Sequence, residues 1–292
     1  MDSHKNNSWF LLRKMIMDLV FLIIVGVAIM LFYFVGSPYE RGFFCEDESL
    51  KYTFKESTIS SSVLYGIGYS LPICIMCLTE WIHLRNTNVG QNRVIFGVEI
   101  PTWVWEAYRV IGVFLFGCAC QQLTTDIAKY TIGRLRPHFF EVCQPDINCT
   151  LPENRLRYIE NFNCLGDNRR RLKEMRLSFP SGHSSFSVFA MFFLAFYIQK
   201  RFSWRGSKLL RHFLQLVVVM MAWYTCLSRI SDNKHHWSDV LAGFLIGLFY
   251  AIVVFLFMYK PNKLELRYTA LIEPLPGLPR PMFMNQNERQ NN

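Results

Sequence analysis

Six long runs of apolar residues dominate this chain of 292 residues. Hydrophobic residues make up 51% of the sequence and aromatic residues 16%, whereas charged residues contribute only 18%. A helix needs about 20 predominantly apolar residues to cross the hydrocarbon core of a bilayer. The sequence therefore predicts an all-α polytopic membrane protein with six transmembrane helices, at residues 15–35, 59–82, 108–129, 184–199, 213–227 and 237–259.

Charges in the connecting segments predict which side of the membrane each segment faces. The segment 199–211 carries five basic residues and no acidic residue, which is typical of a cytoplasmic loop. Arg13 and Lys14 place the N-terminus on the same side. Helix alternation then puts the acidic segment 37–57 outside, together with the arginine-rich segment 131–179. The net charge of +9 does not indicate nucleic-acid binding, because the basic residues lie in loops between apolar runs.

This topology divides the chain into three parts. Residues 1–14 are predicted to be a cytoplasmic N-terminus, residues 15–259 a six-helix domain, and residues 260–292 a cytoplasmic tail. Prolines and polar residues in the tail predict disorder. Within the domain, Trp103 and Trp105 indicate an interfacial segment, placed at residues 94–106.

Cysteines and glycosylation motifs give further expectations for the outer loops. Four of the nine cysteines fall in these loops, where an oxidising compartment allows two disulfides in any of three pairings. They are Cys45, Cys143, Cys149 and Cys164. The sequon at Asn148 is predicted to carry a glycan. The sequon at Asn6 is on the cytoplasmic side and is predicted to stay bare.

Three short motifs at the ends of the apolar runs carry the chemistry. They are Lys129-x6-Arg136-Pro137, Pro180-Ser181-Gly182-His183 and Ser228-Arg229-x5-His235-x3-Asp239. The predicted topology brings all three to the outer face of the membrane. Each motif alone has an ordinary explanation, such as a lysine that reaches the head groups or a turn that enters a helix. The combination on one face favours a functional site.

The residue types in these motifs suit the hydrolysis of a phosphate ester. Cationic side chains neutralise a phosphate and its transition state, and Lys129, Arg136 and Arg229 are predicted to do so. Ser181 and Gly182 begin a helix, where free N–H groups bind anions.

The two histidines are expected to have different tasks. His235 and Asp239 are four residues apart, so on a helix they share a face. We expect Asp239 to accept a hydrogen bond from one ring nitrogen of His235. The other ring nitrogen is then free to attack phosphorus. His183 is then left to protonate the leaving oxygen.

A metal site is the competing use of these side chains. Zinc sites cluster three or four ligands, and two-metal phosphatases need several carboxylates. Acidic residues are few in these motifs, so the sequence predicts metal-independent chemistry.

The motifs resemble the signature of the type 2 phosphatidic acid phosphatase superfamily. Residues 126–129, 133–139, 227–229 and 238–243 are similar to the lipid phosphate phosphatases of animals, and residues 41–45 resemble their first outer loop. This resemblance implies six transmembrane helices, an outward-facing site and no cofactor. It also implies dephosphorylation of phosphatidate, lysophosphatidate, sphingosine 1-phosphate and ceramide 1-phosphate.

The resemblance also implies residue roles. His235 would be the nucleophile, and Asp239 would be the helper of His235. His183 would be the acid. The phosphate would be bound by Lys129, Arg136, Ser181, Gly182 and Arg229.

Two other function classes are considered. A catalytically silent membrane scaffold or adhesion relative would be expected to lose the nucleophile, the acid or the cations, all of which are present. A transporter would need polar residues at mid-membrane, where these runs are almost wholly apolar. The plasma membrane is the expected location, with the endoplasmic reticulum and Golgi as alternatives. The sequence leaves open the organelle, the preferred lipid, a homo-oligomeric state and the role of the tail.

Overall fold

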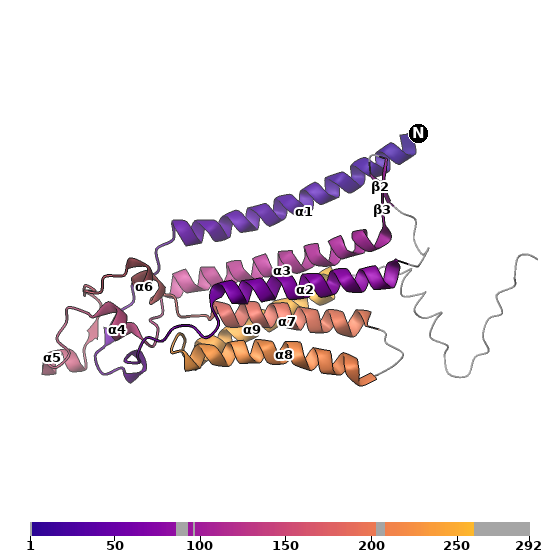
Figure 1. Cartoon of the computed structure of the whole chain (residues 1–292). Helices are drawn as coiled ribbons and strands as arrows, with labels where there is room; N and C mark the ends of the chain where they lie inside the picture. The colour runs from indigo at the N-terminus through magenta and orange to yellow at the C-terminus, as the bar shows by residue number, and fades with distance from the viewer. Residues whose placement is uncertain (1, 86–92, 96, 203–207, 260–292) are drawn as a thin grey trace, which may run out of the picture.

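Long helices lie side by side and leave short connecting elements at both ends (Figure 1). The computed structural model describes residues 2–85, 93–95, 97–202 and 208–259. The long helices are α1 (Asp2–Phe34), α2 (Ser61–Leu84), α3 (Thr102–Ile132), α7 (Gly182–Arg201), α8 (Lys208–Ser231) and α9 (Trp237–Val253). A π-helical turn, η2 (Val254–Met258), continues α9. Residues 2–14, predicted to be a separate N-terminus, form one continuous helix with the first apolar run.

Five of the described helices are long and apolar enough to cross a membrane. The sequence predicts six, and the difference is α7. The first two turns of α7 carry Ser184, Ser185 and Ser187, which lower its average hydropathy. These serines are buried against protein rather than exposed to lipid, so the helix needs less apolar surface than its neighbours do.

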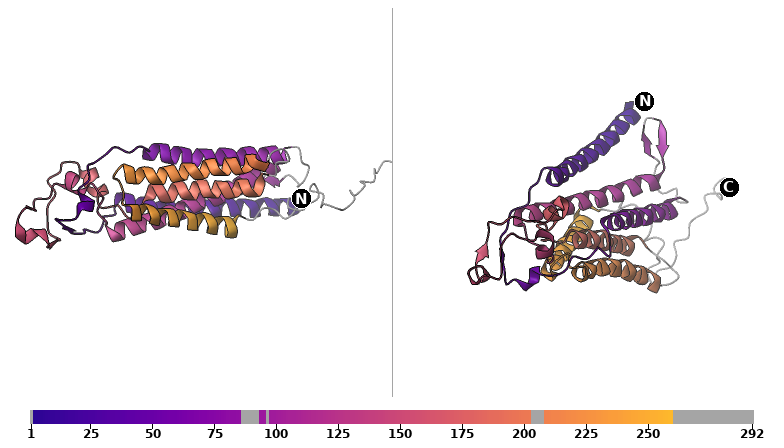
Figure 2. Two further views of the ribbon diagram at one scale, coloured as in Figure 1. Left: turned by 90° about the horizontal axis from the view of Figure 1, so that it is seen from below. Right: turned by 60° about the vertical axis from the view of Figure 1, so that its left-hand side comes forward.

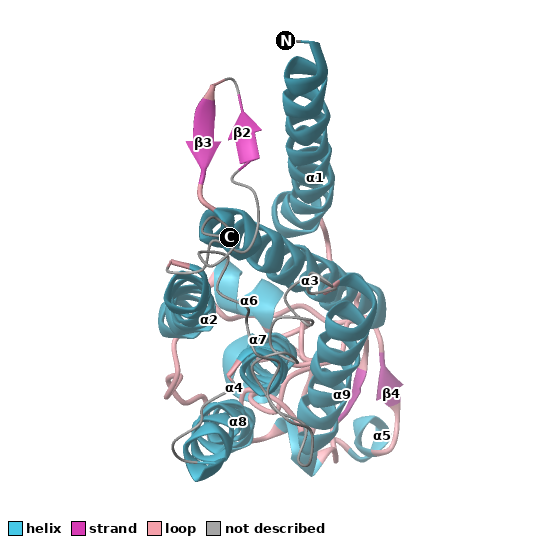
Figure 3. Cartoon of the chain, turned by 90° about the vertical axis from the view of Figure 1, so that its right-hand side faces the viewer, coloured by secondary structure: helices cyan, strands magenta, loops and turns pink. Residues whose placement is uncertain are grey.

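Helix α7 is the centre of the bundle, with α2, α3, α8 and α9 around it (Figure 3). Its phenylalanine side chains at 186, 189 and 193 are almost completely buried. Phe114 of α3 stacks on Phe189, with ring centroids 5.8 Å apart. By contrast, α1 packs mainly on α3 and leaves most of its apolar side chains exposed, as expected for a helix that faces lipid.

Two glycines let α9 approach α7 closely. A Cβ atom on Gly243 would lie 2.5 Å from the carbonyl oxygen of Ser181, and one on Gly247 would lie 2.3 Å from that of Ser185. No larger side chain fits at those distances. The small-xxx-small pattern therefore permits close packing, and it holds the first turn of α9 against the first turn of α7.

The segments 35–60 and 133–181 form a compact lobe at one end of the bundle, called here the loop lobe (Figures 1 and 2). Its core contains Phe43, Leu50, Leu135, Phe139, Cys143, Ile159 and Met175. Strands β1 (Phe43–Phe44) and β4 (Tyr158–Ile159) pair antiparallel. Its short helices are η1 (Glu48–Leu50), α4 (Phe139–Cys143), α5 (Pro152–Arg155) and α6 (Arg169–Glu174).

The predicted interfacial segment at residues 94–106 is part of a β-hairpin and the start of a long helix. Strands β2 (Arg93–Ile95) and β3 (Val98–Ile100) form an antiparallel hairpin, and α3 begins directly after it. Trp103 and Trp105 therefore lie in the first turn of α3, and Trp105 is buried. The predicted disorder of the tail concerns residues 260–292, which lie outside the described residues, as do residues 203–207 of the basic loop.

Candidate active site

The three sequence motifs meet where α3 and α8 end and α7 and α9 begin, next to the loop lobe (Figure 1). Lys129 and Arg229 lie in the last turns of α3 and α8. Asp239 lies in the first turn of α9, and its carbonyl oxygen accepts a 3.0 Å hydrogen bond from the N–H of Ser181. The predicted convergence of four helix ends is therefore confirmed.

Lys129 lies directly over the first residue of α7. A Cβ atom on Gly182 would lie 2.8 Å from Nζ of Lys129, so glycine leaves room for this close approach. Ser181 caps the helix, and its side chain accepts hydrogen bonds from the backbone N–H and the hydroxyl of Ser184. The ammonium group thus sits at the positive end of a helix, a combination that favours a bound anion.

His235 is buried with one ring nitrogen engaged by the backbone. Its Nδ1 lies 2.7 Å from the carbonyl oxygen of Ser178. A carbonyl oxygen only accepts, so the proton is assigned to Nδ1 and the lone pair to Nε2. Burial, and next the charges of Arg136 and Lys129, hold the pKa of His235 well below its usual range. A neutral imidazole with a free Nε2 can act as a nucleophile.

Asp239 contacts His235 less directly than the sequence predicts. The distance from its Oδ2 to Nδ1 of His235 is 3.9 Å, too long for a hydrogen bond. The expected direct bond is wrong, because the backbone carbonyl of Ser178 occupies that nitrogen. The hydroxyl of Ser178 instead donates to Oδ2 of Asp239 at 2.6 Å. Ser178 therefore connects the carboxylate with the imidazole.

Two further residues hold Asp239, which is completely buried. Nη1 of Arg134 lies 2.5 Å from Oδ1, and the N–H of His236 donates to Oδ2 at 3.1 Å in a capping box. A buried carboxylate needs such partners. No signal in the sequence indicated Ser178, because its bond to Asp239 joins residues 61 positions apart. The bond from His236 is local, between residues three positions apart.

Two buried nitrogen atoms at this site have no hydrogen-bond partner among the described residues. They are Nε2 of His183 and Nε of Arg136. The ring of His183 also makes a hydrogen bond with the backbone of Ile59, which leaves Nε2 as its free atom. Unsatisfied buried polar groups are uncommon in folded proteins. Two of them beside several cations indicate a binding site for an anionic ligand.

Arg229 is 1% exposed and completes the cationic group. Its Nη2 donates to Oδ2 of Asp232 at 2.9 Å, and Nε and Nη2 both contact Oγ of Ser228 at 3.2 Å. One edge of the guanidinium is thus anchored by protein. Nη1 has no hydrogen bond among the described residues and remains for a ligand.

Lys234 is a further buried cation that sequence reasoning did not select. Its Nζ lies 3.5 Å from the ring centroid of Phe54. Burial, and next the charge of Arg136, lower the pKa of Lys234 to about 8. Its position beside His235 in the sequence was the signal that could have found it.

These contacts define the chemistry that the site can perform. Cations at 129, 136 and 229 surround two histidines with free ring nitrogens, and a helix N-terminus faces the same space. Within the described part of the chain, no three His, Cys, Asp or Glu side chains gather to hold a metal ion. The arrangement suits attack on a bound phosphate group and protonation of its leaving oxygen.

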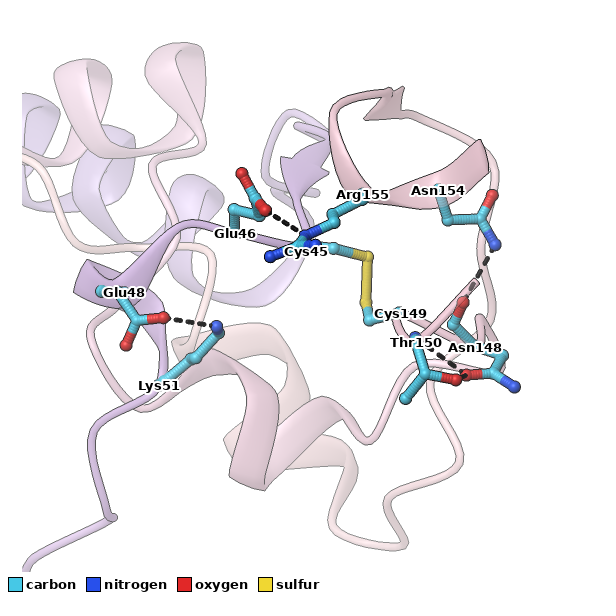
Figure 4. The surroundings of a disulfide bond; sticks show 9 residues. All are labelled: Cys45, Glu46, Glu48, Lys51, Asn148, Cys149, Thr150, Asn154 and Arg155. Carbon is cyan, nitrogen blue, oxygen red and sulfur yellow. Dashed lines mark hydrogen bonds and ion pairs between the residues drawn. A yellow bond between two sulfur atoms is a disulfide. The ribbon is translucent and has the colours of Figure 1, made fainter. Parts of the chain in front are cut away.

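The four cysteines of the loop lobe form two disulfides, Cys45–Cys149 and Cys143–Cys164. The structure thus selects one of the three pairings that the sequence left open. Figure 4 shows the first disulfide beside the predicted glycan acceptor, Asn148. Asn148 is exposed, and its Oδ1 accepts a 2.7 Å hydrogen bond from the hydroxyl of Thr150.

Comparison with known proteins identifies the family of the chain. Residues 111–263 match the PAP2 superfamily. The chain is 51% identical over 267 residues to a Drosophila melanogaster protein named "Putative phosphatidate phosphatase", covering 87% of this chain and 69% of the relative. It is 42% identical over 250 residues to phospholipid phosphatase 1 of Rattus norvegicus, covering 85% of each. It is 38% identical over 235 residues to phospholipid phosphatase 2 of Homo sapiens, covering 80% of this chain and 78% of the relative. No solved structure matches.

The chain therefore belongs to the PAP2 superfamily. It is a phosphatase, and its long apolar helices make it an integral membrane protein. The resemblance found in the sequence motifs is confirmed.

Proposed function

We propose that this phosphatase hydrolyses lipid phosphate monoesters through a phosphohistidine on His235, without a metal ion. The observation that carries the proposal is the pair of unpartnered nitrogens, on His183 and Arg136, within the group of buried cations. The lipid class is supported by the names of the relatives, which describe phosphatidate and phospholipid phosphatases. Phosphatidate, lysophosphatidate, sphingosine 1-phosphate and ceramide 1-phosphate are the proposed substrates, with a role in phospholipid metabolism and lipid signalling.

The first chemical step forms the covalent intermediate. Nε2 of His235 attacks phosphorus, and the bond between phosphorus and the lipid oxygen breaks. Nε2 of His183, which must carry a proton, gives that proton to the departing alkoxide. Lys129, Arg136 and Arg229 stabilise the negative charge of the transition state. A bound phosphate also offsets the surrounding positive charge and so favours the protonated form of His183.

The second step releases inorganic phosphate. Water attacks phosphorus, His183 now accepts a proton from that water, and the bond to Nε2 of His235 breaks. Both histidines then return to their starting states. Asp239 acts on this cycle through Ser178 by keeping the Nδ1 proton of His235 directed at a carbonyl oxygen.

The membrane arrangement is part of the proposal. We place six helices across the bilayer, with α7 as the sixth, and the loop lobe outside the cytoplasm. Two disulfides in that lobe are consistent with an oxidising compartment, and the basic segment 199–211 is consistent with a cytoplasmic loop. The plasma membrane is the proposed location.

The decisive experiment measures phosphate release from the four lipid phosphates in detergent micelles by the purified protein, with and without EDTA. We expect hydrolysis that survives EDTA. Loss of activity in EDTA that added magnesium restores would refute the metal-independent mechanism. A correctly folded protein that hydrolyses none of these lipids would favour the silent scaffold.

A further inference from the structure

Two residues just before helix α2, Thr58 and Ile59, make hydrogen bonds with residues of the candidate site or their neighbours. The backbone N–H of Thr58 donates to Oδ2 of Asp232 at 2.8 Å, and the hydroxyl of Thr58 donates to Oδ1 at 2.7 Å. These partners are 174 positions apart in the sequence. The carboxylate of Asp232 is therefore held on both oxygens by one residue of the loop lobe.

Asp232 in turn holds Arg229. Its Oδ2 accepts a hydrogen bond from Nη2 of Arg229 at 2.9 Å, and the two residues are 5% and 1% exposed. A buried ion pair with several hydrogen bonds has a fixed geometry. Nη1 of Arg229 has no hydrogen bond within the described residues. Its direction therefore depends on the position of the Asp232 carboxylate.

The next residue along the chain holds the second histidine. The backbone of Ile59 makes a hydrogen bond with the ring of His183, whose Nε2 has no partner. Thr58 and Ile59 are adjacent, so one short segment fixes a phosphate-binding cation and the proposed acid at the same time. This segment joins the loop lobe to α2.

We propose that Asp232 is a positioning residue for Arg229 and that Thr58 locks Asp232 in place. The proposal rests on the proposed phosphate-ester hydrolysis and adds two residues to it. Arg229 stabilises charge that grows in the transition state, so a misdirected guanidinium lowers kcat more than it raises KM. We expect Thr58 to act on the reaction through the carboxylate of Asp232 alone.

A double-mutant cycle with the full-length protein in detergent micelles tests the coupling. The variants are Thr58→Val, Asp232→Asn and the combination, with phosphatidate as substrate and kcat expressed per folded enzyme. We expect a loss of about three- to tenfold for Thr58→Val and a larger loss for Asp232→Asn. The combination should be no worse than Asp232→Asn alone, because Thr58 acts through that carboxylate.

Two controls separate positioning from folding. Thr58→Ser keeps the hydroxyl and should restore most of the activity. Ser49→Ala removes a hydroxyl that donates to Asp47 at 2.6 Å in the same lobe, at an exposed position, and should leave kcat unchanged. If Thr58→Val is not recovered as folded protein, Thr58→Ala replaces it in the cycle.

The outcomes are distinct. Additive losses, or a wild-type kcat in both single variants, would overturn the proposal. A wild-type protein that hydrolyses no lipid would refute the proposed function instead. The same variants would then be compared by their affinity for inorganic phosphate, measured by calorimetry. Non-additive changes in affinity would support the coupling, and additive or absent changes would reject it.

Discussion

Ser178 donates a 2.6 Å hydrogen bond from its hydroxyl group to Oδ2 of Asp239. The carbonyl oxygen of the same serine lies 2.7 Å from Nδ1 of His235. The carboxylate of Asp239 therefore holds Ser178 in place, and the backbone carbonyl of Ser178 holds the imidazole of His235. Ser178 thus links the orientations of the two side chains. Both ends of this connection are buried, so water cannot replace a lost partner.

Replacing Ser178 by alanine tests this connection. The Ser178→Ala variant keeps the carbonyl group but loses a hydrogen bond to a buried carboxylate, which typically contributes about 1.5–3 kcal/mol. We expect a kcat that is roughly tenfold or more below wild type, measured on phosphatidate. Ser187→Ala is the matched control, since Ser187 is also buried but donates to the backbone of Ser184. Equal losses in both variants would contradict a specific role for Ser178.

Burial of His138 predicts a dependence of stability on pH. His138 is 3% exposed, its Nδ1 lies 2.8 Å from the carbonyl oxygen of Asn233, and burial is the main cause that lowers its pKa from 6.5 to about 4. The unfolded chain thus binds a proton more readily than the folded chain. Stability is therefore complete above pH 6.5 and falls as the pH decreases from 6.5 towards 4.

The difference corresponds to about 3 kcal/mol at the acidic end of this range. Thermal unfolding in detergent at several pH values should show a smaller loss on acidification for His138→Gln than for wild type. His212→Gln, at an exposed histidine, is the control and should follow the wild-type curve. An identical pH dependence in wild type and His138→Gln would contradict the assignment to His138.

The disulfides predict a loop lobe that depends on oxidation. The two bridges close segments of 104 and 21 residues, and cross-links over such distances typically stabilise a fold by about 2–5 kcal/mol. We expect Cys45→Ser with Cys149→Ser to lower the unfolding temperature. Reductant should lower it in wild type and by a smaller amount in the variant, which keeps the Cys143–Cys164 bridge. Peptide mapping without reduction tests the pairing itself, and a linked Cys45–Cys143 peptide would contradict it.

Glycosylation tests the membrane topology. We expect Asn148 to carry a glycan and Asn6 to stay bare, because the loop lobe is placed outside the cytoplasm. Asn148→Gln should abolish the mobility shift caused by glycosidase, and Asn6→Gln should leave it intact. The reverse result would invert the orientation of the whole bundle.

The sequence was most informative where chemistry depends on local spacing. Lys129, His183 and Arg229 could be placed on one face from the lengths of the apolar runs alone, and the structure brings them together. The sequence was least informative where a contact joins distant segments. Ser178 intervenes between His235 and Asp239 because the loop lobe folds back on α9, and no spacing along the chain encodes that. The same holds for Thr58, which reaches Asp232 from another loop.

Helix α7 shows a second limit. Its serines are compatible with the start of an ordinary transmembrane helix, but in the structure they are buried against other helices. Hydropathy averages cannot distinguish these two environments. The apolar runs therefore predicted six similar spans, whereas the described residues form one central helix of intermediate polarity among five more apolar ones.

Leaving-group dependence separates the roles of the two histidines. If His183 donates a proton, His183→Ala should be impaired most with a lipid alkoxide, where general acid catalysis contributes about 10²–10⁴-fold. An activated aryl phosphate has a better leaving group, so part of the loss should be recovered with it. His235→Ala should show no recovery with either substrate, because no leaving group replaces a missing nucleophile.

Rapid-quench experiments should complete this assignment. A phosphohistidine should accumulate on His235 in wild type and be absent from His235→Ala. Asp239→Asn should retain an intermediate level of activity, since it disturbs the hydrogen bond to Ser178 without removing the imidazole of His235. Phosphate trapped on His183, together with turnover of the aryl ester by His235→Ala, would reverse the assignment, because the free Nε2 of His183 would then be the attacking atom.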